Sequence, residues 1–302
     1  MKLPLSFSPE VMAAMAADTP IVALESTIIT HGMPYPQNVE TARMIEAEIR
    51  SQGVTPATIA IMDGSIHIGL SDDRLEDLAQ STDVLKLSRA DLAFAVANEK
   101  TGATTVAATM ICAHLAGIKV FATGGIGGVH RGAEETFDIS ADLGEFAETP
   151  VIVVGAGAKA ILDLPKTLEI LETRGVPVVT YQQDEFPAFW SRSSGLKSPL
   201  RADTAEEIAA AYNMRETLDL AGGMFVANPI PSCDEISSSE MSPVIEQALE
   251  ESLAQGVAAK AVTPFLLQRI YELTEGRSLK CNIALVQNNA QLATEIAKAL
   301  KS

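Results

Sequence analysis

From residue 21 to residue 227 the chain alternates short apolar runs with longer amphipathic segments, and this alternation restricts its fold more than any other feature. Parallel strands are buried on both faces and read as continuous apolar runs, whereas helices show a periodic apolar stripe. The expected strands are residues 21–24, 58–62, 66–70, 84–87, 118–122, 150–154, 176–181 and 224–227. We therefore predict an α/β protein with three layers, α/β/α, around a mainly parallel central sheet.

The remaining segments follow the same pattern. Ser8 and Asp163 are expected to cap two of the helices. The expected helices are residues 9–17, 37–51, 72–80, 91–100, 104–117, 164–174, 204–220, 243–255, 263–275 and 280–300. Irregular structure is expected for residues 25–36, 184–203 and 228–242, which are broken by Pro, Gly or Ser. No linker, repeat or low-complexity tract stands out, so residues 1–302 are predicted to form a single domain.

The charge of the chain limits its partners. A net charge of −17, from 22 basic and 39 acidic residues, argues against a nucleic-acid polymer as substrate, because such binding needs a basic surface. Cys112, Cys233 and Cys281 stand far apart in the sequence and are expected to be reduced, mostly buried thiols of a cytoplasmic protein. The chain shows no signal-peptide pattern and no apolar run of roughly 18 residues, so no membrane association is expected.

A glycine-rich segment, residues 121–142 (FATGGIGGVHRGAEETFDISAD), follows one expected strand. Glycines at such a place let backbone N–H groups approach an anion. His130 and Arg131 add positive charge beside the loop, which makes His130 a candidate substrate contact. The acids of the segment are Glu134, Asp138 and Asp142. This combination predicts a site that binds a phosphate and a divalent metal ion. The alternative interpretation is a turn followed by a polar helix start.

Lys159 is the candidate nucleophile. It follows an apolar strand and lies among Gly and Ala in VIVVGAGAKA, where burial would favour the neutral amine. The alternative is a solvated lysine in a loop. Glu25 ends another apolar strand, in VALEST, where burial would favour the protonated carboxyl that a general acid needs. Its alternative role is a capping carboxylate.

Oxygen ligands dominate the candidate metal site. Asp138 and Asp142 are four residues apart with Ser140 between them, and carboxylates with water and substrate oxygens suit Mg²⁺ or Mn²⁺ better than Zn²⁺. The alternative is a pair of acids at a helix start. Asn282 and Asn289 are seven residues apart and share a helix face, so they either contact a polar ligand or bond the backbone. His31, His67 and His114 show no ligand spacing and are interpreted as structural.

The loop that carries Lys159 also fits a second function. Gly155, Gly157 and Ala160 match the dinucleotide fingerprint G-x-G-x-x-A, which indicates a nicotinamide-dependent oxidoreductase. Pro165 would interrupt the long helix that the fingerprint requires. The following expected strand also ends at Tyr181 without the acid that binds the ribose. A non-catalytic sugar-phosphate sensor is a third candidate.

Seven motifs together resemble the pseudouridine-5′-phosphate glycosidases, also called the indigoidine synthase A-like family, in family order over nearly the whole chain. They are ESTIITHGMPYPQN (25–38), KLSRADL (86–92), TTVAATM (104–110), FATGGIGGVHRGAE with FDISADL (121–143), VVGAGAKAILDLP (153–165), VANPIP (226–231) and TPFLLQRIYELT (263–274). The resemblance implies reversible cleavage of the C–C glycosidic bond of pseudouridine 5′-phosphate to uracil and ribose 5-phosphate. It also implies an α/β/α homotrimer with one Mn²⁺ ion per subunit.

The same resemblance assigns residues by motif position. It makes Lys159 the nucleophile, Glu25 the proton donor and Asp138 the metal ligand. Substrate contacts fall on Lys86, Val106, Ser140, Ala141 and Asp142. The residue types at these positions fit this chemistry. Uracil is a poor carbon leaving group, so an amine that captures C1′ of the opened ribose as an iminium is better suited to the reaction than two ordinary glycosidase carboxylates.

Overall fold

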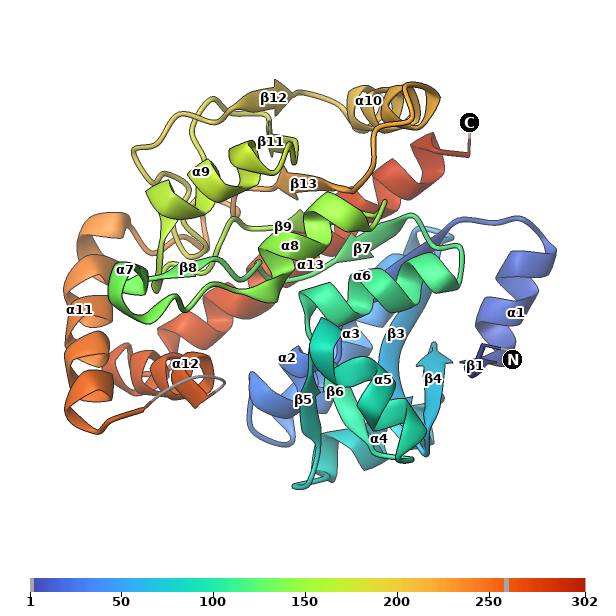
Figure 1. Ribbon diagram of the computed structural model, residues 1–302, viewed down its shortest axis with the longest axis horizontal. Coiled ribbons are helices and arrows are strands. Elements are labelled where there is room, and N and C mark those ends of the chain that lie inside the picture. Colours follow the sequence, from blue (N-terminus) through green and yellow to red (C-terminus); the bar gives the residue numbers. More distant parts are fainter. Residues whose placement is uncertain (1–2, 258–260, 302) are drawn as a thin grey trace.

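The computed structural model describes residues 3–257 and 261–301 and is built on one large twisted sheet (Figure 1). The strands of its main path, in spatial order, are β1 (Leu5–Phe7), β4 (Ser65–Ile68), β3 (Thr55–Met62), β2 (Ile21–Leu24), β7 (Val120–Ala122), β9 (Ile152–Gly155), β13 (Met224–Ala227), β11 (Val178–Tyr181) and β12 (Leu200–Ala202). Two further strands, β5 (Leu85–Leu87) and β6 (Gly102–Thr104), join this sheet through β3. A separate antiparallel pair consists of β8 (Val129–His130) and β10 (Leu162–Asp163).

The direction of the central strands determines where a site can form. From β3 through β2, β7, β9, β13 and β11 to β12, every neighbouring pair is parallel. Only the pairs that β3 makes with β4 and β6 are antiparallel among those of the main sheet. Leu24 lies opposite Ala122, and Ala122 lies opposite Val154, so the carboxyl ends of β2, β7 and β9 meet at one edge. Open parallel sheets bind ligands at this edge.

Helices cover both faces of the sheet. One layer contains α3 (Gln37–Ser51), α10 (Ala205–Thr217) and α13 (Arg277–Ala299), and α13 packs on β2, β7 and β9 as well as on both other helices. The opposite layer, in front of the sheet in Figure 1, contains α5 (Arg89–Ala97), α6 (Val106–Leu115), α8 (Ala141–Glu148) and α9 (Leu164–Thr173). The predicted three-layer α/β/α fold with a mainly parallel sheet is therefore confirmed.

Further helices complete the described part of the chain. They are α1 (Pro9–Ala16), α2 (Thr27–His31), α4 (Asp72–Gln80), α7 (Ala133–Thr136), α11 (Ser238–Ala254) and α12 (Val262–Leu273). The two expected caps are present, because the Ser8 side chain accepts a hydrogen bond from the Val11 N–H and the Asp163 side chain accepts one from the Lys166 N–H. Helices α11 and α12 pack against each other at one end of the molecule (Figure 1).

Several boundaries differ from the sequence prediction. Residues 25–36 contain α2, because a five-residue helix fits before Gly32, where the glycine and proline residues of this segment begin. Three strands of three residues, β1, β6 and β12, were not predicted, since so short a run shows no periodicity. Helix α11 begins at Ser238 rather than at residue 243, because the Ser237 side chain caps it and Pro243 is accommodated inside it.

The core is aliphatic, with few aromatic rings. Cys112 and Cys281 are buried and Cys233 is exposed, and all three are free thiols, as expected. Burial raises the pKa of the Cys112 thiol to about 12, which makes it inert. No helix in the described part of the chain combines the length and the hydrophobicity needed to cross a bilayer.

Candidate active site

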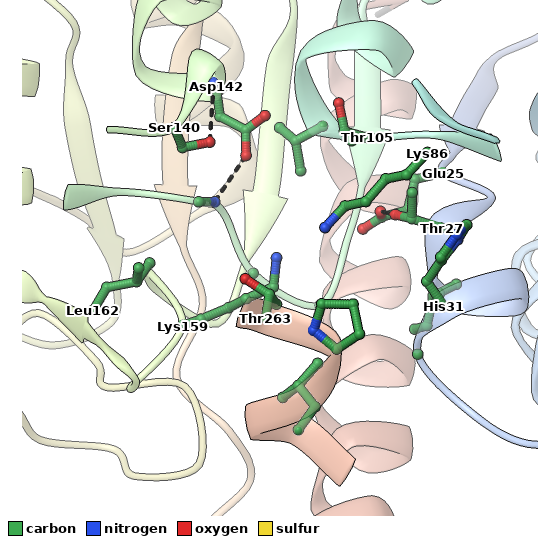
Figure 2. Close-up of a pocket in the computed structure, with 18 of the residues that line it drawn as sticks. Glu25, Thr27, His31, Lys86, Thr105, Ser140, Asp142, Lys159, Leu162 and Thr263 are labelled. Carbon is green, nitrogen blue, oxygen red and sulfur yellow. Dashed lines mark hydrogen bonds between the residues drawn. The ribbon is translucent and has the colours of Figure 1, made fainter. Parts of the chain in front are cut away.

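A cavity of about 370 Å³ opens at the carboxyl edge of the parallel strands. Its lining comes from segments far apart in the sequence, which include the ends of β2, β7 and β9 and the starts of α6 and α8. The cavity brings together ten of the predicted site residues: Glu25, Lys86, Val106, His130, Asp138, Ser140, Ala141, Asp142, Lys159 and Asn282. Figure 2 shows Lys86 and Glu25 on one side of this space and Ser140 and Asp142 on the other. Its volume suits a ligand of nucleotide size.

Glu25 follows β2 directly, so the strand fixes where its carboxylate enters the cavity. The hydroxyls of Thr27 and Thr123 each donate a hydrogen bond to one of its oxygens. Thr123 belongs to the loop after β7, so the carboxylate joins two neighbouring strand ends. The expected apolar setting is therefore only partly correct, because the strand is apolar but the carboxylate itself is held by hydroxyl groups.

Lys159 is positioned by pairing between its own loop and the glycine-rich loop. The N–H of Ala156 donates to the Gly124 carbonyl at 2.9 Å, and the N–H of Lys159 donates to the Ile126 carbonyl at 3.1 Å. The side chain of Lys159 is half-buried and lines the cavity. Its amine makes no hydrogen bond or ion pair with any residue that the structure describes. A fixed backbone thus presents an uncommitted amine to the cavity.

Two glycines are required by these loops. Gly157 has a φ of +99°, and a Cβ there would lie 2.3 Å from the Pro187 carbonyl oxygen. A Cβ on Gly127 would lie 2.3 Å from the Ser140 hydroxyl oxygen. The glycines therefore allow close packing between loops, which is a different reason from the approach to an anion that the sequence suggested.

Asp142 fixes the glycine-rich loop. Its carboxylate accepts one hydrogen bond from the Ala107 N–H at 2.9 Å. It accepts another from the Gly127 N–H at 2.8 Å, drawn as a dashed line in Figure 2. The residue is buried, with 6% exposure, and so fastens the glycine-rich loop to the start of α6. Of the three predicted acids, Glu134 pairs with Lys166 at the surface, and only Asp138 keeps a free carboxylate at the cavity. Asp142 as a second metal-site acid stays a prediction, and the structure gives its carboxylate these two backbone partners.

Asp138 and His130 face each other beside the cavity. The backbone N–H of His130 donates to the backbone carbonyl of Asp138 at 3.0 Å. Burial lowers the pKa of the His130 imidazole, and the charge of Asp138 opposes this effect. Arg131, the other predicted cation, is exposed and does not line the cavity. His130 thus contributes a largely neutral imidazole rather than a fixed charge.

The acids present restrict the kind of metal site. Among the described residues, no three His, Cys, Asp or Glu side chains gather closely enough to enclose a metal ion. The carboxylate of Asp138 makes no hydrogen bond or ion pair within the described part of the chain. The residues therefore fit a divalent ion held by one carboxylate together with water and substrate oxygens, which is a common arrangement for Mg²⁺ and Mn²⁺.

Two helix starts and one lysine form the side of the cavity that is suited to bind an anion. Val106 begins α6 and Ala141 begins α8, and Thr105 and Ser140 cap these helices. Side chains take the N–H groups of Ala107, Ala108 and Asp142, so the N–H groups of Val106 and Ala141 are the ones that these helix starts offer to an anion. Lys86 on β5 reaches into the same space (Figure 2). This side of the cavity is suited to a phosphate.

The two asparagines of α13 separate into different roles. Asn282 lines the cavity and accepts a hydrogen bond from the Trp190 indole at 2.7 Å. Asn289 is fully buried and does not line the cavity; its amide donates to the backbone carbonyls of Thr123 at 2.8 Å and Gly124 at 3.3 Å. The prediction that Asn289 contacts substrate is not supported, and the alternative of backbone bonding is observed.

Sequence reasoning missed several lining residues. Thr27, Thr105 and Thr263 supply hydroxyls, and His31, interpreted as structural, also lines the cavity. Burial lowers the pKa of His31, and the nearby Lys86 lowers it further. All four lie inside the motifs that carry the family resemblance, and this was the available signal, since no spacing links them to a ligand.

The structure does not support the dinucleotide interpretation. After the Gly155–Gly157 turn the chain forms β10, and the next helix, α9, begins only at Leu164. The fingerprint requires a helix that starts at the second glycine and points its free N–H groups at a pyrophosphate. That helix start is absent from this described segment.

Comparison with known proteins agrees with this geometry. The sequence matches the family described as indigoidine synthase A like protein over residues 10–299. It is 68% identical over 300 residues to the pseudouridine-5′-phosphate glycosidase of Jannaschia sp. (strain CCS1), with 99% of each chain covered. It is 65% identical over 298 residues to the protein of the same name from Paracoccus denitrificans (strain Pd 1222), with 98% of each chain covered.

Two solved structures share the fold. One is the prealnumycin C-glycosynthase AlnA in complex with ribulose 5-phosphate, with a TM-score of 0.91 and 38% identity over 99% of this chain and 97% of that one. Another is an indigoidine synthase A-like protein from Thermotoga maritima, with a TM-score of 0.90 and 36% identity over the same shares. The chain therefore belongs to the indigoidine synthase A-like family, as the order of its sequence motifs predicted.

Proposed function

We propose that this enzyme reversibly cleaves the C–C glycosidic bond of pseudouridine 5′-phosphate to give uracil and ribose 5-phosphate. The observation that carries the proposal is the uncommitted amine of Lys159 in one cavity with the carboxylate of Glu25. Relatives at 60–68% identity over nearly the whole chain bear the name of this activity, which supports it. The likeness to a C-glycosynthase that binds a sugar phosphate supports it as well.

The chemistry can be written with these two residues. Glu25 gives a proton to the ring oxygen as the C1′–O4′ bond breaks, and the Lys159 nitrogen bonds to C1′. The Lys159 nitrogen loses a proton on bonding to C1′. The C1′–C5 bond then breaks, its electron pair leaves with uracil, and C5 takes up that proton. The nitrogen lone pair stabilises the electron-deficient C1′ as an iminium. Water hydrolyses the iminium and releases ribose 5-phosphate, so the C–C step is a lyase-type step and the net reaction consumes one water.

The other lining residues bind and orient the substrate. Lys86 and the starts of α6 and α8, through Val106, Ser140 and Ala141, suit the phosphate and the sugar hydroxyls. Asp142 acts on the substrate through the loop that it fastens. His130 lies beside Asp138 and suits a sugar hydroxyl as a neutral partner.

We also propose that Asp138 holds one Mn²⁺ ion per subunit together with water and substrate oxygens. Such an ion supplies positive charge that helps to hold an anionic substrate. Chelation followed by dialysis should abolish turnover, and Mn²⁺ should restore it better than Zn²⁺. Asp138→Asn should bind Mn²⁺ more weakly while its circular dichroism is unchanged. Full activity of the metal-free protein would contradict this assignment.

The assembly and the location are proposed from the resemblance. A homotrimer is proposed, and multi-angle light scattering at micromolar concentration should give a mass about three times that of the chain. A monomer mass would contradict it. A cytoplasmic location is proposed because the three cysteines are free thiols and the substrate is a nucleotide.

Uracil release tests the activity. Incubation with pseudouridine 5′-phosphate should produce equal amounts of uracil and ribose 5-phosphate, detected by chromatography. Binding of ribose 5-phosphate with no turnover would favour a sensor instead. Tight stoichiometric binding of NADH, measured by fluorescence, would favour an oxidoreductase.

A further inference from the structure

The side-chain amide of Asn282 is held in one orientation by Trp190, the only tryptophan in the chain. The indole Nε1–H donates to Asn282 Oδ1 at 2.7 Å and to the Ser278 carbonyl at 3.3 Å. An indole N–H can only donate, so the amide atom facing it must be the oxygen. The amide nitrogen Nδ2 then lies at the other end of the group, and it makes no hydrogen bond with any described residue.

Trp190 is itself fixed in place. Its exposure is 1%, and its ring packs edge-on against Phe189 with centroids 5.0 Å apart. Its backbone carbonyl accepts a hydrogen bond from the Ile236 N–H at 3.0 Å. Turning the Asn282 amide over would point N–H donors at the buried indole N–H and leave that donor with only its longer bond to the Ser278 carbonyl. The buried tryptophan therefore specifies which end of the amide is available to a ligand.

The base of the substrate is the part that faces Asn282. Apolar side chains surround this end of the cavity: Phe189, Pro264, Leu267 and Val286. A flat pyrimidine fits such a surface. The phosphate belongs with Lys86 and the helix starts of α6 and α8, and the sugar carbon C1′ belongs at Lys159. An extended nucleotide that satisfies both conditions places its base against α12 and α13.

We infer that Trp190 is a specificity-determining residue that acts through Asn282. The fixed amide offers a hydrogen-bond donor and no acceptor, so it selects a pyrimidine with a carbonyl oxygen at that position. An exocyclic amino group at the same position would meet another donor and is rejected. This inference rests on the proposed function and extends it from a reaction to the choice of base.

The synthetic direction tests the selection. Ribose 5-phosphate is combined in turn with uracil, cytosine and isocytosine, and each coupling forms a C-nucleotide with release of water. Cytosine replaces one carbonyl of uracil with an amino group, and isocytosine replaces the other. The wild-type enzyme should prefer uracil over at least one of them by roughly 100-fold or more in kcat/KM.

Trp190→Phe removes the indole donor and keeps an aromatic ring. The amide can then turn over, so the KM for uracil should rise about tenfold and the preference over the rejected base should fall by a similar factor. A merely structural role of Trp190 would lower the rate for every base alike and leave the ratio unchanged. Phe186→Leu is the matched control, because Phe186 is a buried neighbour that packs on Phe225 away from Asn282. It should lower thermal stability and leave the ratio unchanged.

Asn282→Asp is the second variant. One carboxylate oxygen can still accept from Trp190, and the other presents an acceptor to the base. Uracil should become a poor substrate, and the base with an amino group at that position should be preferred. If both variants keep the wild-type order of bases, the inference is overturned. If the wild-type enzyme couples ribose 5-phosphate to none of the bases, the proposed function fails and the inference fails with it.

Discussion

At the residue scale, the carboxylate that we propose as the proton donor depends on a hydroxyl that the sequence does not point to. Thr123 donates to Glu25, although the two residues are 98 positions apart. A hydrogen bond to a charged group contributes about 1.5–3 kcal/mol. The strands β2 and β7 are neighbours in the sheet, and this pairing alone brings the two side chains together.

Thr123→Val should therefore lower kcat for cleavage about 10- to 100-fold, because it removes this donor with little change in shape. Steady-state kinetics on pseudouridine 5′-phosphate measures the effect. Thr123→Ser keeps a hydroxyl and should recover most of the rate. Equal rates for the valine and serine variants would contradict the role of the hydrogen bond.

At the scale of elements, the site depends on the close packing of one loop against α8. Gly127→Ala would place a methyl group 2.3 Å from the Ser140 hydroxyl and 2.7 Å from the Asp142 carboxylate. The loop must then move away from α8, and a displacement of about 1 Å in an active site costs on the order of 100-fold in rate. The variant should therefore lose about this factor in kcat/KM.

Gly144→Ala is the matched control for this variant. Gly144 lies inside α8, and a Cβ there would meet no atom within 4 Å. Alanine in a helix interior is more stable than glycine by about 0.5–1 kcal/mol, so urea unfolding should show a gain in stability with normal activity. Normal activity of Gly127→Ala would show that the loop tolerates the displacement.

The elements themselves were largely predictable. The helices 37–51 and 72–80 have the predicted bounds, because their apolar stripes and flanking residues are clear. Strands β6 and β12 could not be predicted, since three residues carry no pattern and their pairing partners lie far away in sequence. Asn289 shows the same limit for a site residue. Its spacing from Asn282 was visible, but only the fold shows that it bonds Thr123.

At the scale of the whole molecule, folding disfavours the charged form of two half-buried histidines. Burial lowers the pKa of His31 and of His67 below the ordinary value of 6.5, and Lys86 and Arg74 lower them further. Below about pH 6.5 the unfolded chain takes up protons that the folded chain resists, so the free energy of unfolding should fall. Above that pH the two states bind the same number of protons at these sites.

Urea unfolding at about pH 7.5 and about pH 5.5 measures this loss. The carboxylates also change the stability at acid pH. The variant His67→Gln therefore separates the contribution of this histidine from that of the carboxylates. It should lose less stability between the two pH values than the wild-type protein does. An equal or larger loss in the variant would contradict the assignment for His67.

The site was predictable where motif and fold agree. Glu25 follows the end of β2 and Lys159 follows the glycine-containing turn after β9, and the parallel sheet brings such ends to one edge. Asp138 follows the short helix α7 and lines the same cavity. The role of Asp142 could not be read from its spacing, because its two partners are backbone N–H groups on other elements. Distant backbone contacts of this kind exist only in the folded chain.

The central claim is that Lys159 forms an iminium with C1′ of the sugar. Borohydride added during turnover reduces an iminium to a stable amine, so a ribose-phosphate adduct should remain on the protein and peptide mass mapping should place it on Lys159. Lys159→Ala should lose the adduct and nearly all of kcat. Lys159→Arg should fail as well, because a guanidinium stays charged. An adduct on Lys86, or wild-type turnover by Lys159→Ala, would contradict the mechanism.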